Sequence, residues 1–222
     1  MKTHQDSELK LWGGSSDHVS RRRFIAGAAA ASAFTIIPRR LLGGPGQVAP
    51  NAKTPLAAIG TGGQGLQNVQ AFLDFPEIQV VAVCDVNRES EGYVSWNWNA
   101  GKGRNTAGRE PARRLVESHY AKQRESGTYR GCKAYVDYRE MLANEDVDAV
   151  MIATPDHTHA VIAMDAIKRG KHVYCEKPLA YTPYEVRQLT EAARRAGVAT
   201  QLGNQGQATI DARVTCEMIW SG

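Results

Sequence analysis

A glycine-rich stretch with the spacing G-x-G-x-x-G occupies residues 60–65. It follows the apolar residues 56–59 and precedes apolar residues at helical spacing, so it is expected to turn a strand into a helix. Such a turn lets backbone approach a pyrophosphate, and the N–H groups at a helix N-terminus favour bound phosphate. The spacing predicts a dinucleotide phosphate site, and a purely structural turn is the alternative. The candidate phosphate-binding residues are Gly60, Gly62, Gly63 and Gly65.

An acidic residue follows the next apolar run. Asp85 comes 20 residues after Gly65 and directly after residues 78–84. Its carboxylate can accept hydrogen bonds from the ribose hydroxyls of an adenosine. The same charge would repel a 2′-phosphate, so NAD is the expected cofactor. Arg88 could pair with such a phosphate, which keeps NADP as the alternative.

Polar residues also follow two later apolar runs, as Asp156-His157-Thr158-His159 and as Glu176-Lys177-Pro178. A lysine at a strand end could bond or relay a hydroxyl proton, and an ordinary surface lysine is the alternative. His157 and His159 invite a metal interpretation. Residues two apart on a helix point about 200° apart, however, so no metal site is expected. Asp156 is expected to cap a helix.

Short apolar runs alternating with amphipathic segments must position these residues. Strands alternating with helices of about 10–15 residues predict βαβ units and a parallel sheet. A capping box at residues 182–185 and Gly197 delimit one of the helices. The expected fold class is α/β with a doubly wound parallel sheet of Rossmann type. The predicted strands are residues 56–59, 78–84, 149–153, 172–175 and 198–202.

Residues 88–131 interrupt this alternation and are rich in Arg, Lys and Trp. One interpretation is a basic, aromatic surface for nucleic acid. The aromatic residues do not alternate with the basic ones as stacking platforms would. We therefore favour an insertion that carries one solvated helix, at about residues 109–126, and expect no nucleic-acid partner.

With these motifs the sequence resembles the Gfo/Idh/MocA family of oxidoreductases. The resemblance covers residues 55–222 and is carried by residues 153–159, by the stretch GKHVYCEKPL at residues 170–179, and by the glycine-rich loop. Residues 203–206, Gly-Asn-Gln-Gly, resemble exported members. The family implies NAD or NADP as cofactor and a sugar or polyol as substrate.

The resemblance also implies roles for individual residues. Glu176 would help hold the nicotinamide ribose, and Lys177 would act at the substrate hydroxyl as the catalytic residue. Pro178 would follow a cis peptide bond. The nicotinamide side of the cleft would be lined by Thr154, Pro155 and His159. The family adds a C-terminal α/β domain that supplies further catalytic groups, so residues 1–222 alone are expected to bind dinucleotide without turnover.

The N-terminal residues form a separate segment. Residues 1–50 hold seven Lys/Arg and three Asp/Glu, which accounts for the net charge of +4. Arg21-Arg22-Arg23 precede an apolar run of about 14 residues, which is too short to span a bilayer and typical of a signal peptide. The arginine pair resembles the twin-arginine export signal, and a buried N-terminal helix is the alternative. We expect export to the periplasm and no stable membrane anchor.

Composition and cysteine content are typical of a globular chain. The apolar share is 42% and the charged share 23%, which excludes a largely disordered chain. Four cysteines without a C-x-x-C pair exclude a disulfide-dense scaffold and a cysteine-based zinc module, and Cys84 and Cys175 should be buried. The expected domains are residues 1–52 as signal and linker, 53–206 as the dinucleotide-binding domain, and 207–222 as a connection to the further domain.

Three functions follow from these observations. The first is an oxidoreductase that moves a hydride between nicotinamide and a secondary hydroxyl of a sugar, polyol or similar substrate. The second is a glycoside hydrolase that keeps NAD bound and acts by transient oxidation and elimination. The third is a dinucleotide-binding module without catalysis. The partners expected are a small-molecule substrate and the twin-arginine machinery, and the full-length protein could form homo-oligomers.

Overall fold

A six-stranded parallel sheet forms the centre of the chain in the computed structural model, which describes residues 48–94 and 104–222. The strand order is β5-β2-β1-β6-β7-β8, and every pair in it is parallel. The strands are β1 (Thr54–Ile59), β2 (Ile78–Cys84), β5 (Lys133–Tyr135), β6 (Ala149–Ile152), β7 (His172–Glu176) and β8 (Thr200–Gly203). The order reverses between β1 and β6, as in a doubly wound Rossmann sheet, so the predicted fold class is confirmed.

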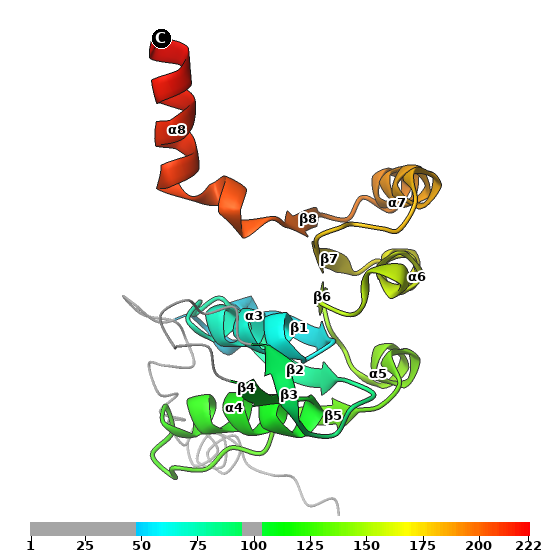
Figure 1. The fold of residues 1–222 in the computed structure, drawn as a ribbon. Helices are drawn as coiled ribbons and strands as arrows, with labels where there is room; N and C mark the ends of the chain where they lie inside the picture. Colours follow the sequence, from blue (N-terminus) through cyan, green and yellow to red (C-terminus); the bar gives the residue numbers. More distant parts are fainter. Residues whose placement is uncertain (1–47, 95–103) are drawn as a thin grey trace, which may run out of the picture. The chain divides into compact units, whose positions relative to one another are not determined.

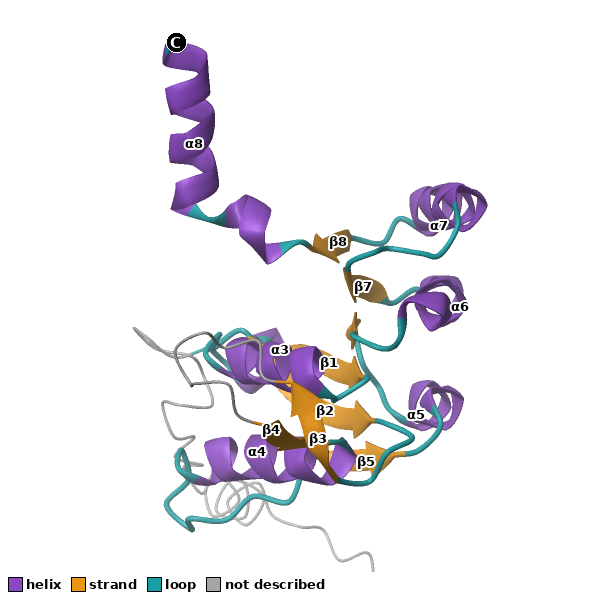
Figure 2. Cartoon of the chain, viewed as in Figure 1, coloured by secondary structure: helices purple, strands orange, loops and turns teal. Residues whose placement is uncertain are grey.

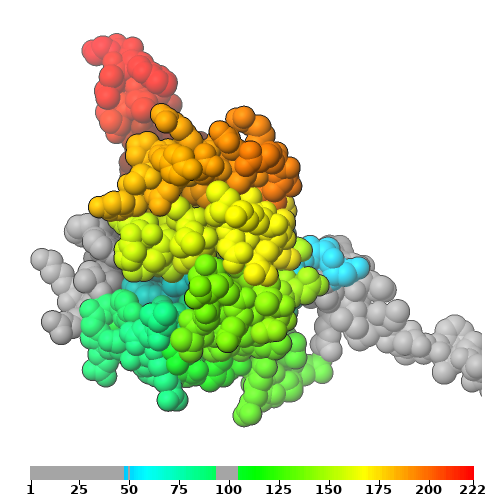
Figure 3. Space-filling model, turned by 90° about the vertical axis from the view of Figure 1, so that its right-hand side faces the viewer, coloured from blue at the N-terminus to red at the C-terminus, as the bar shows by residue number. Residues whose placement is uncertain are grey.

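Helices cover both faces of this sheet, as Figure 1 shows. One face carries α3 (Gly63–Leu73) and α4 (Arg109–Ala121). The other carries α5 (Tyr138–Asn144), α6 (Asp156–Lys168) and α7 (Pro183–Ala196), whose residues form successive bands in Figure 3. The remaining elements are η1 (Pro50–Ala52), the hairpin of β3 (Ser90–Val94) and β4 (Arg104–Ala107), η2 (Gln205–Ala208) and α8 (Ile210–Ser221), coloured by type in Figure 2.

The two cores follow from the alternation of side chains along the strands. In β1, Leu56 and Ala58 pack with the core under α3 and α4, whereas Ala57 and Ile59 pack with the core under α5, α6 and α7. Successive residues of a strand point to opposite faces, so a strand covered on both sides reads as one continuous apolar run. This is why the central strands were predictable from the sequence.

The helix predicted at residues 109–126 is not a solvated insertion. It is α4, which ends at Ala121 and buries Ala112, Val116 and Tyr120 against α3 and the sheet. These residues recur every four positions, so they share one helix face although basic residues surround them. The helix connects β2 to β5 and is therefore part of the Rossmann architecture, a correction to the sequence interpretation.

Three further differences concern local boundaries. Asp156 is the first residue of α6 rather than its cap, because Pro155 occupies the capping position. The last strand is Thr200–Gly203 rather than residues 198–202. The sequence patterns did not predict β5, α5 and the β3–β4 hairpin, which are short or polar, or α8, whose apolar residues have no buried face. No helix in residues 48–94 and 104–222 is long and apolar enough to cross a membrane.

Candidate functional site

The carboxyl ends of four neighbouring strands meet at one edge of the sheet. The register pairs Ile59 with Cys84 and with Ile152, and Ile152 with Cys175. The residues that follow these positions therefore lie along one line, at the place where the strand order reverses. This crevice is where doubly wound sheets bind ligands. Four of the predicted site residues lie at or directly after these strand ends, namely Gly60, Asp85, Thr154 and Glu176.

The glycine-rich loop joins β1 to α3, which begins at Gly63. Gly60 has a φ of 81°, and a Cβ on it would lie 2.5 Å from the carbonyl oxygen of Ala153. A Cβ on Gly65 would overlap the carbonyl oxygen of Gly60. These two glycines are therefore required by close packing of backbone on backbone. The atoms nearest to a Cβ on Gly62 would belong to the Tyr93 ring, at 2.7 Å, so a side chain rather than backbone lies beside Gly62 there.

Asp85 fastens the end of β2 to this loop. Its Oδ2 accepts a hydrogen bond of 2.7 Å from the backbone N–H of Thr61, and its Oδ1 accepts one of 2.8 Å from the backbone N–H of Asn87. Arg109 donates to the carbonyl oxygens of Asp85 and Val86. The carboxylate is half-buried, and its oxygens keep further lone pairs for ligand hydroxyls.

Arg88 lies exposed in the loop after β2, and Asn87 precedes it. The side-chain amide of Asn87 donates to the Tyr93 hydroxyl, at 3.1 Å, and so joins this loop to the β3–β4 hairpin. The sequence analysis did not identify Asn87 or Tyr93 as site residues. The hairpin strands are short and polar, and their place beside the loop follows from the Tyr93 ring near Gly62 and from the backbone hydrogen bond of 3.0 Å that Gly108, directly after β4, donates to Thr61.

His159 holds the loops after β6 and β7 together rather than lining the cleft with its ring nitrogens. Its Nδ1 lies 2.6 Å from the carbonyl oxygen of Pro178, and its Nε2 lies 2.8 Å from that of Thr154. The residue is 1% exposed. Thr154 also accepts a hydrogen bond from the hydroxyl of Thr158, and Pro155 is exposed at the start of α6. His159 is therefore a buried link between the two loops, and its place beside the nicotinamide stays a prediction.

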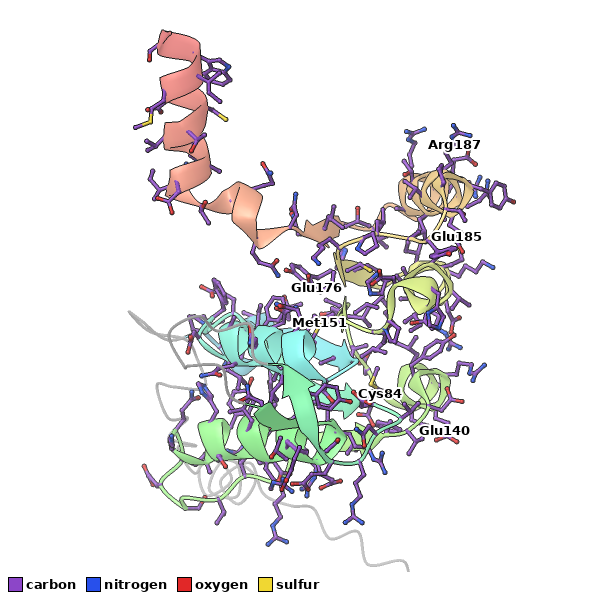
Figure 4. The ribbon with its side chains drawn as sticks, viewed as in Figure 1. Cys84, Glu140, Met151, Glu176, Glu185 and Arg187 are labelled. Carbon is purple, nitrogen blue, oxygen red and sulfur yellow. The ribbon has the colours of Figure 1, made fainter. Side chains whose placement is uncertain are left out.

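Glu176 is the buried carboxylate of the site, with 5% of its surface exposed. Its Oε1 accepts hydrogen bonds of 2.6 Å from both Asn68 and Gln205, and a longer one of 3.4 Å from the Tyr174 hydroxyl. Figure 4 labels Glu176 at the end of β7, where it extends toward α3. Sequence analysis found Glu176 but missed Asn68 and treated Gln205 only as part of a family pattern.

Lys177 follows Glu176 and is exposed, as is Pro178. The peptide bond between them is cis, as the resemblance implied. An exposed ammonium at the carboxyl end of β7 can reach a small molecule bound in the crevice. Its catalytic role stays a prediction.

The thiols near the site are protonated at neutral pH. Burial, with a smaller contribution from the Asp85 charge, raises the pKa of Cys84 to about 12. Burial and then the Glu176 charge raise the pKa of Cys175 to about 12. Neither thiol can serve as a thiolate nucleophile, because the thiolate is the reactive form. The expected burial of both cysteines is confirmed.

The part of the chain that the structure describes holds no group of three or more His, Cys, Asp or Glu placed to bind one metal ion. His157, the residue that the metal alternative paired with His159, lies exposed in the first turn of α6. The two ring nitrogens of His159 both contact backbone carbonyl oxygens. The geometry therefore gives no support to that alternative.

Comparisons with known proteins agree with this geometry. Residues 92–204 match the Gfo/Idh/MocA family model, described as an oxidoreductase family with an NAD-binding Rossmann fold. An alpha-N-acetylgalactosaminidase of Shewanella oneidensis is 29% identical over 196 residues, which cover 80% of this chain and 38% of that protein.

Two solved structures have the same fold. An NAD-binding oxidoreductase from Klebsiella pneumoniae is 30% identical, with a TM-score of 0.51 over 77% of this chain and 39% of that one. The WlbA dehydrogenase from Bordetella pertussis, solved with NADH and UDP-GlcNAcA, is 21% identical, with a TM-score of 0.56 over 78% of this chain and 41% of that one. The chain thus spans about two fifths of the length of the relatives it matches.

Proposed function

The chain belongs to the Gfo/Idh/MocA oxidoreductase family, and on this premise we propose that it is the cofactor-binding part of an NAD(P)-dependent oxidoreductase. The reaction would move a hydride between nicotinamide and a secondary hydroxyl carbon of a sugar, polyol or similar substrate. One observation carries the proposal. The glycine-rich loop, Asp85 and the Glu176-Lys177 pair converge where the strand order reverses.

The residues present fit a dinucleotide. Gly62 caps α3 without a side chain, so the first N–H groups of α3 can receive a pyrophosphate. Asp85 lies one strand away and would accept hydrogen bonds from the adenosine ribose. Its charge favours NAD over NADP, while Arg88 is the group that would pair with a 2′-phosphate. Glu176, one strand beyond β6, would accept a hydrogen bond from the nicotinamide ribose.

Bound nicotinamide would supply the hydride acceptor or donor. The chain would supply the polar groups around the reacting carbon. Lys177 would donate a hydrogen bond to the substrate oxygen and help its proton to leave or return. His159 would keep the Lys177–Pro178 turn in place through the Pro178 carbonyl.

A glycoside hydrolase that retains NAD is the second candidate, and the similarity to an alpha-N-acetylgalactosaminidase favours it. Such an enzyme would use the same cofactor and the same lysine. Transient oxidation of a sugar hydroxyl acidifies the neighbouring C–H, which allows the aglycone to be eliminated. The two candidates therefore differ in whether reduced cofactor or free aglycone accumulates.

Titration of the 222-residue chain with NAD and NADP in a calorimeter tests cofactor binding, with tighter binding of NAD expected. No binding of either would remove the proposal. In the full-length protein, net NADH formation with free sugars or polyols would support the dehydrogenase. Nitrophenol release from a nitrophenyl α-N-acetylgalactosaminide without net NADH would support the hydrolase. Cofactor binding without either activity would indicate a non-catalytic module.

We also propose that the protein is exported in folded form. Support comes from Arg21-Arg22, directly before the apolar run of residues 24–37. Both lie outside the residues that the structure describes. Export of a folded protein would let the chain acquire its cofactor in the cytoplasm before it works in the periplasm.

A further inference from the structure

We propose that Asn68 is a positioning residue, which with Gln205 fixes Glu176 in the orientation that the nicotinamide ribose requires. The inference rests on the proposed function, because it assumes that Glu176 contacts that ribose. The inference adds two side-chain amides to the site, and both come from helical elements rather than from the ends of strands. It also gives Gln205 a physical role.

Asn68 connects the glycine-rich loop to Glu176. It lies in α3 and is 7% exposed. Its Nδ2 donates to Glu176 Oε1 over 2.6 Å, while its Oδ1 accepts a hydrogen bond of 2.8 Å from Gln64 Nε2. Gln64 belongs to the G-x-G-x-x-G stretch. A single amide therefore joins the predicted pyrophosphate loop to the end of β7.

Gln205 approaches Glu176 from η2. Its Nε2 donates to Glu176 Oε1 over 2.6 Å and to the Tyr174 hydroxyl over 3.1 Å. Gly203 provides the necessary space, because a Cβ there would lie 2.7 Å from Glu176 Cδ. The carboxylate is thus held by one donor from α3 and one from η2, with backbone close beside it.

The distribution of these hydrogen bonds points to a ligand. Among the described residues, every hydrogen bond to the Glu176 carboxylate ends on Oε1. No salt bridge to Glu176 is found in the same part of the chain. A buried carboxylate without a counter-ion is costly, and neutral donors on one oxygen compensate only part of that cost. Fixing Oε1 leaves Oε2 as the acceptor for a ribose hydroxyl.

The test compares two ligands that differ in the nicotinamide riboside half. NADH carries that half and ADP lacks it, so only NADH reaches Glu176. In Asn68→Leu, which removes the amide at similar size, we expect the Kd for NADH to rise about tenfold or more, because a charge-assisted arrangement is lost. We expect the Kd for ADP to rise by no more than about threefold, since ADP does not reach Glu176 and Asn68→Leu affects its site only through the lost contact with Gln64.

Two further variants of the 222-residue chain complete the experiment. Gln70→Leu is the matched control, because Gln70 is an exposed amide of the same helix, and both Kd values should stay unchanged. In a Glu176→Ala background, which removes the group that Asn68 would orient, Asn68→Leu should have little additional effect on NADH binding.

Each remaining outcome overturns the inference. Equal NADH binding by wild type and Asn68→Leu would show that Glu176 needs no orientation by Asn68. Loss of ADP and NADH binding together in Asn68→Leu would make Asn68 a residue of the fold only. Failure of the wild-type chain to bind ADP or NADH would remove the proposed function as well. If Asn68→Leu weakens NADH binding as much in the Glu176→Ala background as in the wild-type chain, Asn68 acts by another route.

Discussion

Asp85 Oδ2 accepts a hydrogen bond of 2.7 Å from the backbone N–H of Thr61. The two residues are 24 positions apart in the sequence and follow adjacent parallel strands. The carboxylate shapes the loop that would hold the pyrophosphate, and it stays half-exposed. In the proposed function it would also bind the adenosine ribose, a second role that the sequence pattern does not separate from the first.

Substitutions of Asp85 should separate these two tasks. Asp85→Ala should weaken NAD binding by about 1.5–3 kcal/mol, because charge-assisted hydrogen bonds to the ribose are lost together with the loop contact. Asp85→Asn keeps an acceptor for the Thr61 N–H and should lose less. Calorimetry with NAD and NADP measures both, and the ratio of NADP to NAD affinity should rise in each variant. Unchanged NAD binding by Asp85→Ala would remove Asp85 from the site.

The glycines of the loop should respond differently to a methyl group. Gly65→Ala places a Cβ onto the backbone carbonyl of Gly60 and should destabilise the fold by on the order of 3 kcal/mol or more. In Gly62→Ala the atoms nearest to the new Cβ belong to the Tyr93 ring, a side chain that can turn away, so the loss should be less than about 1 kcal/mol.

Cofactor binding provides the second measurement for these variants. Gly62→Ala should fold normally but bind NAD about tenfold more weakly or worse, because the methyl group occupies the approach to the pyrophosphate. Urea unfolding and calorimetry on the same samples check both effects. Equal loss of stability in Gly62→Ala and Gly65→Ala would contradict this assignment of roles.

The central part of the fold was predictable because its signals are local. The strands of the sheet interior are covered on both faces and read as apolar runs, and the capping box at Thr182 and Glu185 fixes the start of α7. The helix α4 was misjudged, because its buried residues are few and lie among Arg and Glu. Its burial depends on packing against α3 and the sheet, which the periodicity of one segment does not display.

The candidate site divides in the same way. Its residues at strand ends were predictable, since parallel strands bring their carboxyl ends to one edge. The hydrogen bonds of Asn68, Gln205 and His159 join residues from different elements, and no spacing rule encodes them. The pair of Asn68 and Glu176, for example, spans 108 positions. Such contacts follow from the assembled sheet rather than from any motif.

His159 should contribute to stability more than its exposed neighbour His157. His159→Leu removes both ring nitrogens of this buried side chain, and with them the hydrogen bond that the ring N–H donates to the carbonyl oxygen of Thr154 or of Pro178, according to the tautomer. The expected loss in the free energy of unfolding is about 1–3 kcal/mol, the cost of losing a hydrogen bond at a buried site. His157→Leu is the matched control and should change stability by less than about 0.5 kcal/mol. Denaturant titration measures both, and similar values for the two variants would contradict the buried role of His159.

Export should depend on the arginine pair. Replacing both residues, Arg21→Lys and Arg22→Lys, keeps the charge of the segment but removes the pair that the twin-arginine interpretation requires. A folded reporter fused after residue 52 should then stay in the cytoplasm, whereas the wild-type leader should deliver it to the periplasm. Cell fractionation measures the distribution. Periplasmic delivery by the double-lysine leader would point to another export route.

Alkaline pH should destabilise the fold through its buried thiols. Burial is the largest cause that raises the pKa of Cys84, Cys132 and Cys175 from 9.0 to about 12. The unfolded chain releases these protons near pH 9 while the folded chain retains them, so the folded state binds more protons between the two values. The free energy of unfolding should therefore be unaffected below about pH 8.5 and fall as the pH rises above 9. The slope approaches about 1.4 kcal/mol per pH unit for each thiol.

Urea titrations at pH 8, 9 and 10 measure this slope. Cys132→Ala should make the slope shallower, and Cys216→Ala, at an exposed position, is the matched control. An unchanged slope in Cys132→Ala would show that this thiol ionises alike in the folded and unfolded chains.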